Sequence, residues 1–310
     1  MVKLSVVVSS FNSENTIEEC LKSVSFADEI IVVDGTSLDK TLDIAKRYAS
    51  KILVKPNNLM LNVNKNFGFS KAKGDWILSL DSDERITKEL KEEILSTLNS
   101  LPSRQAGQLS TPDGYWIPRK NIIFGKWIEH KGWYPDNQLR LFRNGKGKFA
   151  EQHVHEMVKV DGEVGHLKNS LIHNNYSTVS QFFQKTGEIY APNEADQILK
   201  NGYIFDWRDS IRFPLKEFLS RFFAREGYKD GLHGLILSML MAFYHLIVFV
   251  NIWEKQKFNA IDERDFLENT EKEMKNGSRE IFFWFSKEKI AGMKNPLSKT
   301  MHKIFRKVRS

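Results

Sequence analysis

Four short apolar runs open the chain, and a segment with helical periodicity follows each of the first three. The runs are rich in Val, Ile and Leu, a composition typical of parallel strands that are covered on both faces. They span residues 4–10, 28–37, 51–56 and 75–81. Because strand and helix alternate in this way, the pattern predicts an open, mostly parallel α/β sheet of Rossmann-like type flanked by helices.

The pattern changes after an amphipathic helix that is predicted over residues 86–101. Short aromatic and β-rich pieces fill residues 102–180. From residue 206 the chain becomes basic and aromatic, and residues 232–250 then carry no formally charged side chain. These shifts predict three regions: a catalytic domain over 1–205, a helical membrane-associating region over 206–260 and a basic C-terminal tail over 261–310.

The apolar segment 232–250 admits three arrangements. Its length suffices for a membrane-spanning helix. His233 and His245 interrupt it, however, and a cationic amphipathic segment precedes it, which favours a helix lying in the membrane interface. A buried helical hairpin packed against the domain is the third arrangement.

The net charge of the chain indicates which class of partner it binds. The 310 residues are 41% apolar and 27% charged, as in an ordinary globular protein, and carry a formal net charge of +7. Residues 294–310 contain six Lys or Arg and no acid, with apolar residues at helical spacing. This composition fits an anionic membrane surface better than nucleic acid, for which the chain has no recognised binding motif. A solvated tail is the alternative.

The N-terminus and the cysteine content indicate the compartment. The first residues, MVKLSVVVSS, run straight into an expected strand and lack the features of a secretory signal peptide. The single cysteine, Cys20, fits a reducing compartment and is expected to be a buried apolar residue on a helix. We therefore expect a cytoplasmic protein that is peripheral on the inner face of the cell membrane.

Three carboxylates in four residues end the fourth apolar run: Asp81, Asp83 and Glu84. Like charges this close repel, and each costs free energy to desolvate unless a positive group lies between them. On an extended chain Asp81 and Asp83 point to the same side, and two hard oxygen ligands suit Mg²⁺ or Mn²⁺ with a substrate diphosphate. The sequence therefore predicts a divalent metal here. A polar loop that caps the next helix is the alternative, and Glu84 is expected to face elsewhere, serving that helix or supporting the site.

Asp34 ends another expected strand. Ligands of open α/β sheets bind beyond the carboxyl ends of strands, so Asp34 is a candidate for hydrogen bonding to a nucleotide base or ribose. A turn residue before Gly35 is the alternative. The chain contains neither G-x-G-x-x-G nor G-x-x-x-x-G-K-[ST], which argues against a dinucleotide-binding domain and against a P-loop.

Several segments resemble known sequences. The early motifs resemble a family 2 glycosyltransferase of GT-A fold: SVVVSSFNSENTIEECLKSV, EIIVVDGTSLDKTLDIAK and NKNFGFSKAKGDWILSLDSDERIT. Later pieces resemble the bacterial subgroup that adds glucose or a related sugar to the lipopolysaccharide core: WYPDNQLRLFRNGKGKF, VHE and YKDGLHGLILSMLMAFY. The chain departs from the subgroup at Ser82, where Ala is more frequent, and in DGTSLDKT, where D-x-G-S-x-D is usual.

The resemblance implies a nucleotide pocket at the ends of the first two strands. Ser10, Phe11 and Asn12 would line this pocket, with the ring of Phe11 against the base. Asp34 would hydrogen-bond the uracil.

The resemblance also implies a diphosphate and metal site. Lys65 and Asn66 would lie near the ribose or the diphosphate, although Lys65 could equally be a helix-surface lysine. Asp81 would hold the ribose, directly or through the metal, and Asp83 would bind the metal. His155 could add a third metal ligand, the alternative being a structural histidine.

An inverting displacement needs a carboxylate base within hydrogen-bond reach of the acceptor hydroxyl. Asp136 matches the Asp of an E-D-x-x-L-x-x-R motif in related enzymes, with Pro135 in place of the Glu. Glu156 is the rival, and Asp136 as a turn residue is a further alternative. Arg140 and Arg143 could neutralise a diphosphate or an anionic acceptor, or could be solvated.

Together the resemblance implies metal-dependent, inverting transfer of a hexose from a UDP-sugar to a lipid-linked glycan acceptor, such as lipopolysaccharide core, at a membrane surface. A polyprenyl-phosphate sugar transferase would differ in its acceptor. A non-enzymatic membrane-binding protein with a vestigial nucleotide site is another alternative. A sugar-nucleotide pyrophosphorylase would need a glycine-rich basic loop after the first strand, and SSFNSENT has no glycine.

Overall fold

The structure is a computed structural model and describes residues 2–56, 61–100, 111–130, 132–151, 156–260, 264–295 and 297–301. Contacts divide the chain into two compact units. The first comprises Met1–Glu129 and Trp133–Ser177, and the second comprises His130–Gly132 and Thr178–Ser310. Each unit buries an apolar core of its own.

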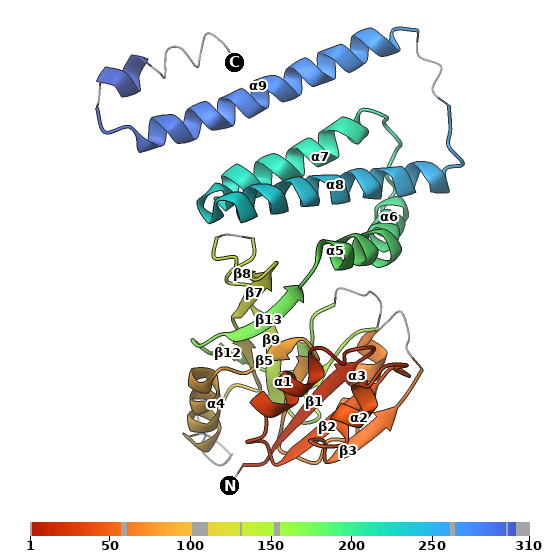
Figure 1. The fold of residues 1–310 in the computed structure, drawn as a ribbon, viewed down its shortest axis with the longest axis vertical. Helices are drawn as coiled ribbons and strands as arrows, with labels where there is room; N and C mark the ends of the chain where they lie inside the picture. The colour runs from red at the N-terminus through yellow and green to blue at the C-terminus, as the bar shows by residue number, and fades with distance from the viewer. Residues whose placement is uncertain are drawn as a thin grey trace. The chain divides into compact units, whose positions relative to one another are not determined.

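A seven-stranded sheet in the order β12-β6-β9-β4-β1-β2-β3 forms the centre of the first unit (Figure 1). Its strands are β1 (Leu4–Ser10), β2 (Glu29–Asp34), β3 (Lys51–Val54), β4 (Trp76–Asp81), β6 (Gly114–Ile117), β9 (Gln138–Arg143) and β12 (Val164–His166). β1 pairs in parallel with β2 and β4, and β2 pairs in parallel with β3, whereas β9 runs antiparallel between β4 and β6. The mostly parallel α/β sheet predicted from the four apolar runs is confirmed.

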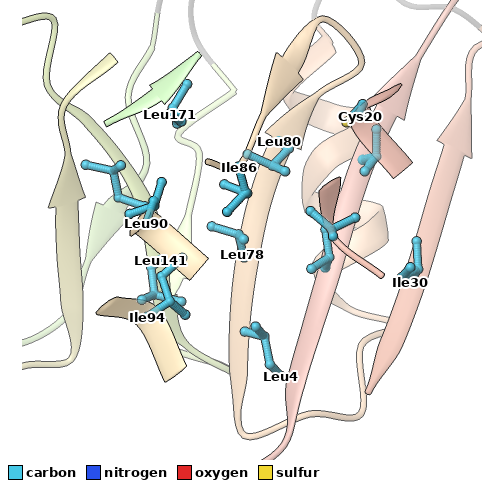
Figure 2. Packing of buried hydrophobic residues seen from close by; sticks show 14 of the residues in the cluster. Leu4, Cys20, Ile30, Leu78, Leu80, Ile86, Leu90, Ile94, Leu141 and Leu171 are labelled. Carbon is cyan, nitrogen blue, oxygen red and sulfur yellow. The ribbon is translucent and has the colours of Figure 1, made fainter. Parts of the chain in front are cut away.

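Side chains of this sheet alternate between two cores on its opposite faces. The helices of the unit are α1 (Ile17–Ser23), α2 (Thr41–Ala45), α3 (Leu61–Phe69) and α4 (Lys88–Ser100). Val6 and Val8 of β1 join the larger core, to which α1, α2 and α4 contribute (Figure 2). Val7 joins the other core with Phe69 of α3. Cys20 is fully buried in the larger core, as expected.

Strand register brings the candidate residues to one edge. Ser10 at the end of β1 pairs with Asp34 at the end of β2, and Ser9 pairs with Asp81 at the end of β4. The polar residues at the ends of these three strands therefore lie together at the carboxyl edge of the parallel strands, where ligands of such sheets bind.

A second sheet has four strands in the order β5-β13-β7-β8. Its strands are β5 (Glu84–Arg85), β13 (Leu171–Tyr176), β7 (Arg119–Ile123) and β8 (Lys126–Trp127), and a separate hairpin joins β10 (Gly147–Lys148) to β11 (Lys159–Val160). His173 of β13 pairs with Glu84 on one side and with Asn121 on the other. This pairing carries β7 and β13 to the acidic segment that follows β4.

The second unit is helical. Its helices are α5 (Val179–Lys185), a π-helical turn (Thr186–Tyr190), α6 (Ala191–Lys200), α7 (Asp209–Leu219), a second π-helical turn (Ser220–Ala224), a 3-10 turn (Gly227–Asp230), α8 (Leu232–Lys255) and α9 (Phe266–Gly292). α8 packs along α7 and α6, while α9 packs on α7 (Figure 1). Ala191, Tyr244, Val248 and Ile252 lie in the core between α6 and α8.

α8 is the one helix in the described ranges that is long and apolar enough to cross a membrane, judged by length and composition. Its 24 residues have a mean hydropathy of 2.2 over the most apolar window, and 33% of that window is buried. α8 forms within the region 206–260, and α9 lies within the expected tail 261–310. The boundaries at 205 and 260 stay predictions, while the structure groups α5 and α6 with the later helices.

Candidate active site

Asp34 is buried and accepts the hydrogen bonds that hold the loop after β2 in place. The Ser10 hydroxyl donates to Asp34 Oδ1 at 3.1 Å, and the Ser37 hydroxyl donates to the same oxygen at 2.6 Å. The Ser37 N–H donates to Asp34 Oδ2 at 2.8 Å. Asp34 is 0% exposed, so its carboxylate fixes the loop that follows it. Its role toward a uracil stays a prediction.

Asn12 ties the loops after β1 and β2 together. Its side-chain oxygen accepts from the Leu38 N–H at 2.9 Å, and its own N–H donates to the Ser37 hydroxyl at 2.8 Å. Asn12 has φ of 46°, a left-handed conformation that Asn tolerates better than most residues. Phe11 beside it is 40% exposed, so its ring is accessible to a ligand.

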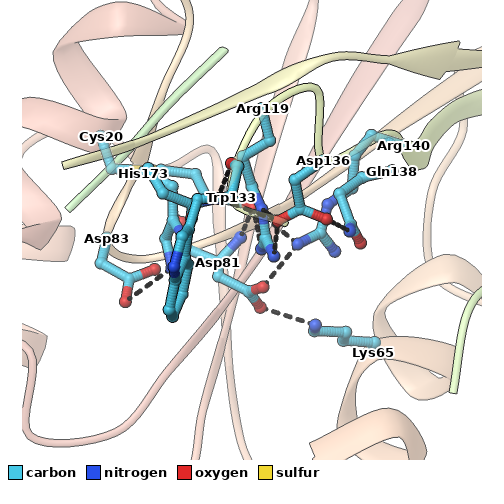
Figure 3. A network of polar contacts seen from close by, with 12 residues as sticks. Cys20, Lys65, Asp81, Asp83, Arg119, Trp133, Asp136, Gln138, Arg140 and His173 are labelled. Carbon is cyan, nitrogen blue, oxygen red and sulfur yellow. Dashed lines mark hydrogen bonds and ion pairs between the residues drawn. The ribbon is translucent and has the colours of Figure 1, made fainter. Parts of the chain in front are cut away.

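Asp81 is flanked by two protein cations. Lys65 Nζ lies 2.6 Å from Asp81 Oδ1, and an Arg140 terminal nitrogen lies 2.7 Å from Oδ2 (Figure 3). Burial alone would raise the pKa of Asp81, but Lys65 and Arg140 outweigh it and hold the pKa well below its usual range. Much of the charge crowding seen in the sequence is therefore relieved by side chains. Lys65 is 7% exposed, and so is not a helix-surface lysine.

Glu84 faces into the site. It is 0% exposed, accepts from the Asp81 N–H at 3.0 Å, and lies 2.6 Å from Arg140 and 3.3 Å from Arg119. Of the two roles expected for Glu84, these contacts fit support of the site. Its orientation differs from the expectation, because the turn after β4 folds its side chain back toward the Asp81 N–H. Glu84 supports the site from within and is the buried counter-charge for two arginines.

Asp136 accepts four hydrogen bonds. Arg119 donates to its Oδ2 through Nε at 2.8 Å and through a terminal nitrogen at 2.5 Å, and Asn121 donates to the same oxygen at 3.1 Å. Gln138 donates to Oδ1 at 2.8 Å. Burial would raise the pKa of Asp136, but Arg119 and these hydrogen bonds lower it overall, so the carboxylate is ionised near neutral pH. Oδ1 carries fewer of the bonds and is the better placed to accept a proton.

A relay of polar contacts, two hydrogen bonds and one longer contact, leads from Asp136 to Asp83. Asn121 gives its amide hydrogens to Asp136 and to the Trp133 carbonyl, at 2.8 Å for the latter, so its oxygen faces His173 Nδ1 at 2.7 Å. Nδ1 is therefore the donor, and His173 Nε2 lies 3.5 Å from Asp83 Oδ2 (Figure 3). Asn121 is 1% exposed and His173 is 8% exposed, which fixes this geometry.

The remaining candidates lie on a neighbouring segment or outside the described residues. Asn66 donates to the Phe149 carbonyl at 3.0 Å and to Glu151 at 2.7 Å, so its amide holds that segment to α3. Glu156 accepts from the Glu151 N–H at 2.7 Å. His155 lies outside the described residues.

Asp81, Asp83 and His173 are the side chains at this edge that could meet a divalent metal. Within the described ranges, no three His, Cys, Asp or Glu side chains form a cluster that could hold a metal ion. Both oxygens of Asp81 face cations, so Asp83, with His173 Nε2 beside it, is the carboxylate that would hold a metal. Mg²⁺ is commonly bound through one or two carboxylates plus substrate phosphates, so these residues fit a metal that a bound diphosphate completes.

Sequence reasoning missed Arg119, Asn121 and His173. Each lies on a short strand of the second sheet, and alternation within such short strands does not reveal which residues meet the acidic segment. β7 reads RKNII and β13 reads LIHNNY, so each holds several polar residues and none of them stands out as a site residue. Arg140 reaches the site, whereas Arg143 lies at the other end of β9, 3.2 Å from Asp113.

Comparison with known proteins places the site in a family context. Residues 5–150 match the family model described as Glycosyl transferase family 2. That range contains Asp34, Asp81, Asp83 and Asp136, the carboxylates at the centre of the site.

Relatives extend the similarity beyond this range. The chain is 26% identical over 272 residues to the lipopolysaccharide core biosynthesis glycosyltransferase LpsC of Rhizobium meliloti (strain 1021), covering 83% of this chain and 94% of that protein. It is 27% identical over 266 residues to an uncharacterized glycosyltransferase of Rickettsia typhi, covering 82% and 88%. Among solved structures, Staphylococcus aureus TarS 1-349 in complex with UDP-GlcNAc aligns with a TM-score of 0.44 at 16% identity, over 84% of this chain and 95% of that chain.

Proposed function

Because this chain is a family 2 glycosyltransferase, and therefore an enzyme, we propose that it moves a hexose from a UDP-sugar to a lipid-linked glycan. Its sheet and flanking helices have the α/β architecture expected of a GT-A enzyme. Glucose or a similar hexose is the proposed donor sugar. The name of the Rhizobium meliloti relative supports lipopolysaccharide core as the acceptor. We place the reaction at the cytoplasmic face of the membrane as part of the same proposal.

The observation that carries this proposal is the coupling of Asp136 and Asp83 through two buried side chains. Asn121 and His173 hold the two carboxylates in one frame, at distances of 3.1, 2.7 and 3.5 Å along the relay. A transferase needs one carboxylate for the acceptor hydroxyl and another for the leaving diphosphate. A rigid frame that links them supports assigning these two roles.

In the proposed reaction Asp136 accepts the proton of the acceptor hydroxyl. The hydroxyl oxygen forms a bond to the anomeric carbon on the face opposite to UDP, and the bond from that carbon to the diphosphate oxygen breaks. UDP leaves with the electron pair, so the configuration at the anomeric carbon inverts. Arg119 keeps Asp136 ionised before the reaction and oriented during it.

Binding of the donor would use the edge of the sheet. Phe11 would stack on the base, Asp34 would read the uracil and Asp81 would hold the ribose. A divalent ion, Mn²⁺ or Mg²⁺, held through Asp83 would neutralise charge on the diphosphate when bound. Lys65, 2.6 Å from Asp81, keeps a positive charge at the same edge.

A donor panel tests the proposal. The full chain is incubated with UDP-glucose, UDP-galactose, UDP-GlcNAc and GDP-mannose, with Mg²⁺ or Mn²⁺, and release of the nucleoside diphosphate is measured. We expect UDP to be released from one UDP-hexose in a metal-dependent reaction, and faster when a lipopolysaccharide core acceptor is added. Release from GDP-mannose alone, or from no donor, would overturn the proposal.

A further inference from the structure

α8 presents an apolar stripe to solvent. Six exposed residues recur at alternating spacings of three and four, with one gap of seven, and so share one face of the helix: Leu232, Ile236, Met239, Phe243, Val250 and Trp253. Exposed fractions are 71% for Leu232 and 54% for Met239. The ring of Phe183 on α5, itself 43% exposed, lies 5.8 Å from that of Phe243 and widens the stripe. A continuous exposed apolar surface of this kind marks an interaction site.

We propose that this stripe is the surface by which the enzyme lies on an anionic lipid bilayer, with α8 parallel to the membrane plane. The inference rests on the proposed function in one respect, namely that the acceptor is held in a membrane. The inference goes beyond the proposed function because it assigns the membrane contact to one face of α8. It also selects the interfacial helix over a membrane-spanning helix and a buried hairpin for residues 232–250.

The opposite face of α8 argues against a membrane-spanning helix. It packs along α6 and α7, and charged residues of those helices contact it directly. Tyr244 of α8 hydrogen-bonds Glu194 of α6, and Lys255 lies 2.8 Å from Asp196. His245 lies 3.7 Å from Glu217 of α7. If α8 crossed the bilayer, these carboxylates would have to enter hydrocarbon, where charged groups are costly.

The charge distribution favours lipid over a second copy of the chain. Residues 206–293 hold 14 Lys or Arg and 14 Asp or Glu, so they are neutral, and the six Lys or Arg of residues 294–310 supply the excess positive charge. An anionic surface would attract this basic segment, whereas the same segment of a second copy would repel it. Helices that pair through an apolar seam also carry charged flanking positions that set the register, and residues 232–250 contain no Asp, Glu, Lys or Arg.

Vesicle flotation with the full chain tests the proposal. The probes are vesicles of phosphatidylethanolamine with phosphatidylglycerol, and vesicles of phosphatidylcholine alone. We expect the chain to float with the anionic vesicles and to be released by alkaline carbonate, as a peripheral protein is. Met239→Asp should weaken binding roughly tenfold and Ile236→Asp/Met239→Asp more, because each places a charge where an apolar side chain enters the interface.

Val164→Asp is the matched control, because Val164 is 40% exposed on β12 of the first unit and should leave flotation unchanged. Metal-dependent release of UDP without vesicles should be equal in all variants, so a failure of the proposed function is seen separately from a failure of the stripe. Undiminished flotation of the double variant would overturn the proposal, as would resistance to carbonate. So would light scattering that shows a wild-type dimer converted to a monomer by Met239→Asp with flotation intact.

Discussion

Arg119 places two nitrogens on one oxygen of Asp136, at 2.8 and 2.5 Å, and leaves the other carboxylate oxygen to Gln138. This pairing orients the carboxylate and favours its ionised form. A base that is ionised and held in one orientation can take a proton without prior rearrangement. Asp136 can act as the proposed base because Arg119 holds it in this state.

Replacing Arg119 by Gln should shift the pH dependence of transfer. Arg119 lowers the pKa of Asp136, so its removal raises that pKa toward or above the usual range for Asp. The acid limb of the kcat/KM profile should therefore move to higher pH, while Arg119→Lys should move it less. A pH–rate profile of the three proteins checks this. An unmoved acid limb in Arg119→Gln would show that Asp136 is not the group that titrates.

Replacing Asp83 by Asn should remove the coupling between metal and nucleotide. Asp83 is the proposed metal ligand, so UDP with Mn²⁺ should raise the melting temperature of the wild type but not that of Asp83→Asn. Differential scanning fluorimetry with and without Mn²⁺ measures this apart from catalysis. Because Asp83→Asn keeps the size of the side chain, the melting temperature without ligand serves as the control for folding. An equal Mn²⁺-dependent rise in both proteins would assign the metal elsewhere.

Replacing Glu84 by Gln should destabilise the first unit strongly. The change leaves buried Arg140 with one carboxylate partner fewer, and breaking a buried ion pair from one side costs about 3 kcal/mol or more. Chemical denaturation monitored by tryptophan fluorescence gives the free energy of unfolding. Glu92→Gln, on an exposed position of α4, is the matched control and should change that free energy little. Similar losses in the two variants would contradict the role given to Glu84.

Asp81 should contribute to stability in a pH-dependent way. Its folded-state pKa lies well below the usual Asp value, so the contribution is present above the unfolded pKa of about 3.9 and is lost as pH falls through the folded value. Asp81→Asn should therefore be less stable than the wild type near neutral pH, and the difference should shrink in the acid range. Denaturation curves at a series of pH values measure this. A difference that is constant with pH would refute the assignment.

The sequence predicts those parts of the fold that depend on residues close together in the chain. The apolar runs predicted β1 to β4, and the acids at the strand ends predicted the edge at which Asp34 and Asp81 meet, because parallel pairing puts successive strand ends together. Arg119, Asn121 and His173 could not be found this way. They lie on β7 and β13, and they reach the acidic segment because β13 pairs with β5 on one side and with β7 on the other, which joins residues far apart in the chain.

The sequence also did not predict which positive side chains would neutralise the acidic segment. A divalent metal was the predicted answer to the crowding of Asp81, Asp83 and Glu84, whereas the structure answers much of it with protein cations. Lys65 comes from α3 and Arg140 from β9, and neither position follows from the acidic segment itself. The burial of Glu84 likewise depends on the tight turn after β4. The sequence does not predict this turn, because Glu84 lies between two other charged residues and has no local pattern of a buried side chain.

Asp136 is the proposed base of a UDP-hexose transferase, and Asp136→Asn is the variant that decides this role. Transfer from the UDP-hexose identified in the donor panel is measured for both proteins, alongside binding of UDP. We expect Asp136→Asn to bind UDP with wild-type affinity but to transfer at least about a hundredfold more slowly, because the acceptor hydroxyl then lacks a base. Glu156→Gln should retain activity. Wild-type transfer by Asp136→Asn, or a comparable loss in Glu156→Gln alone, would contradict the claim.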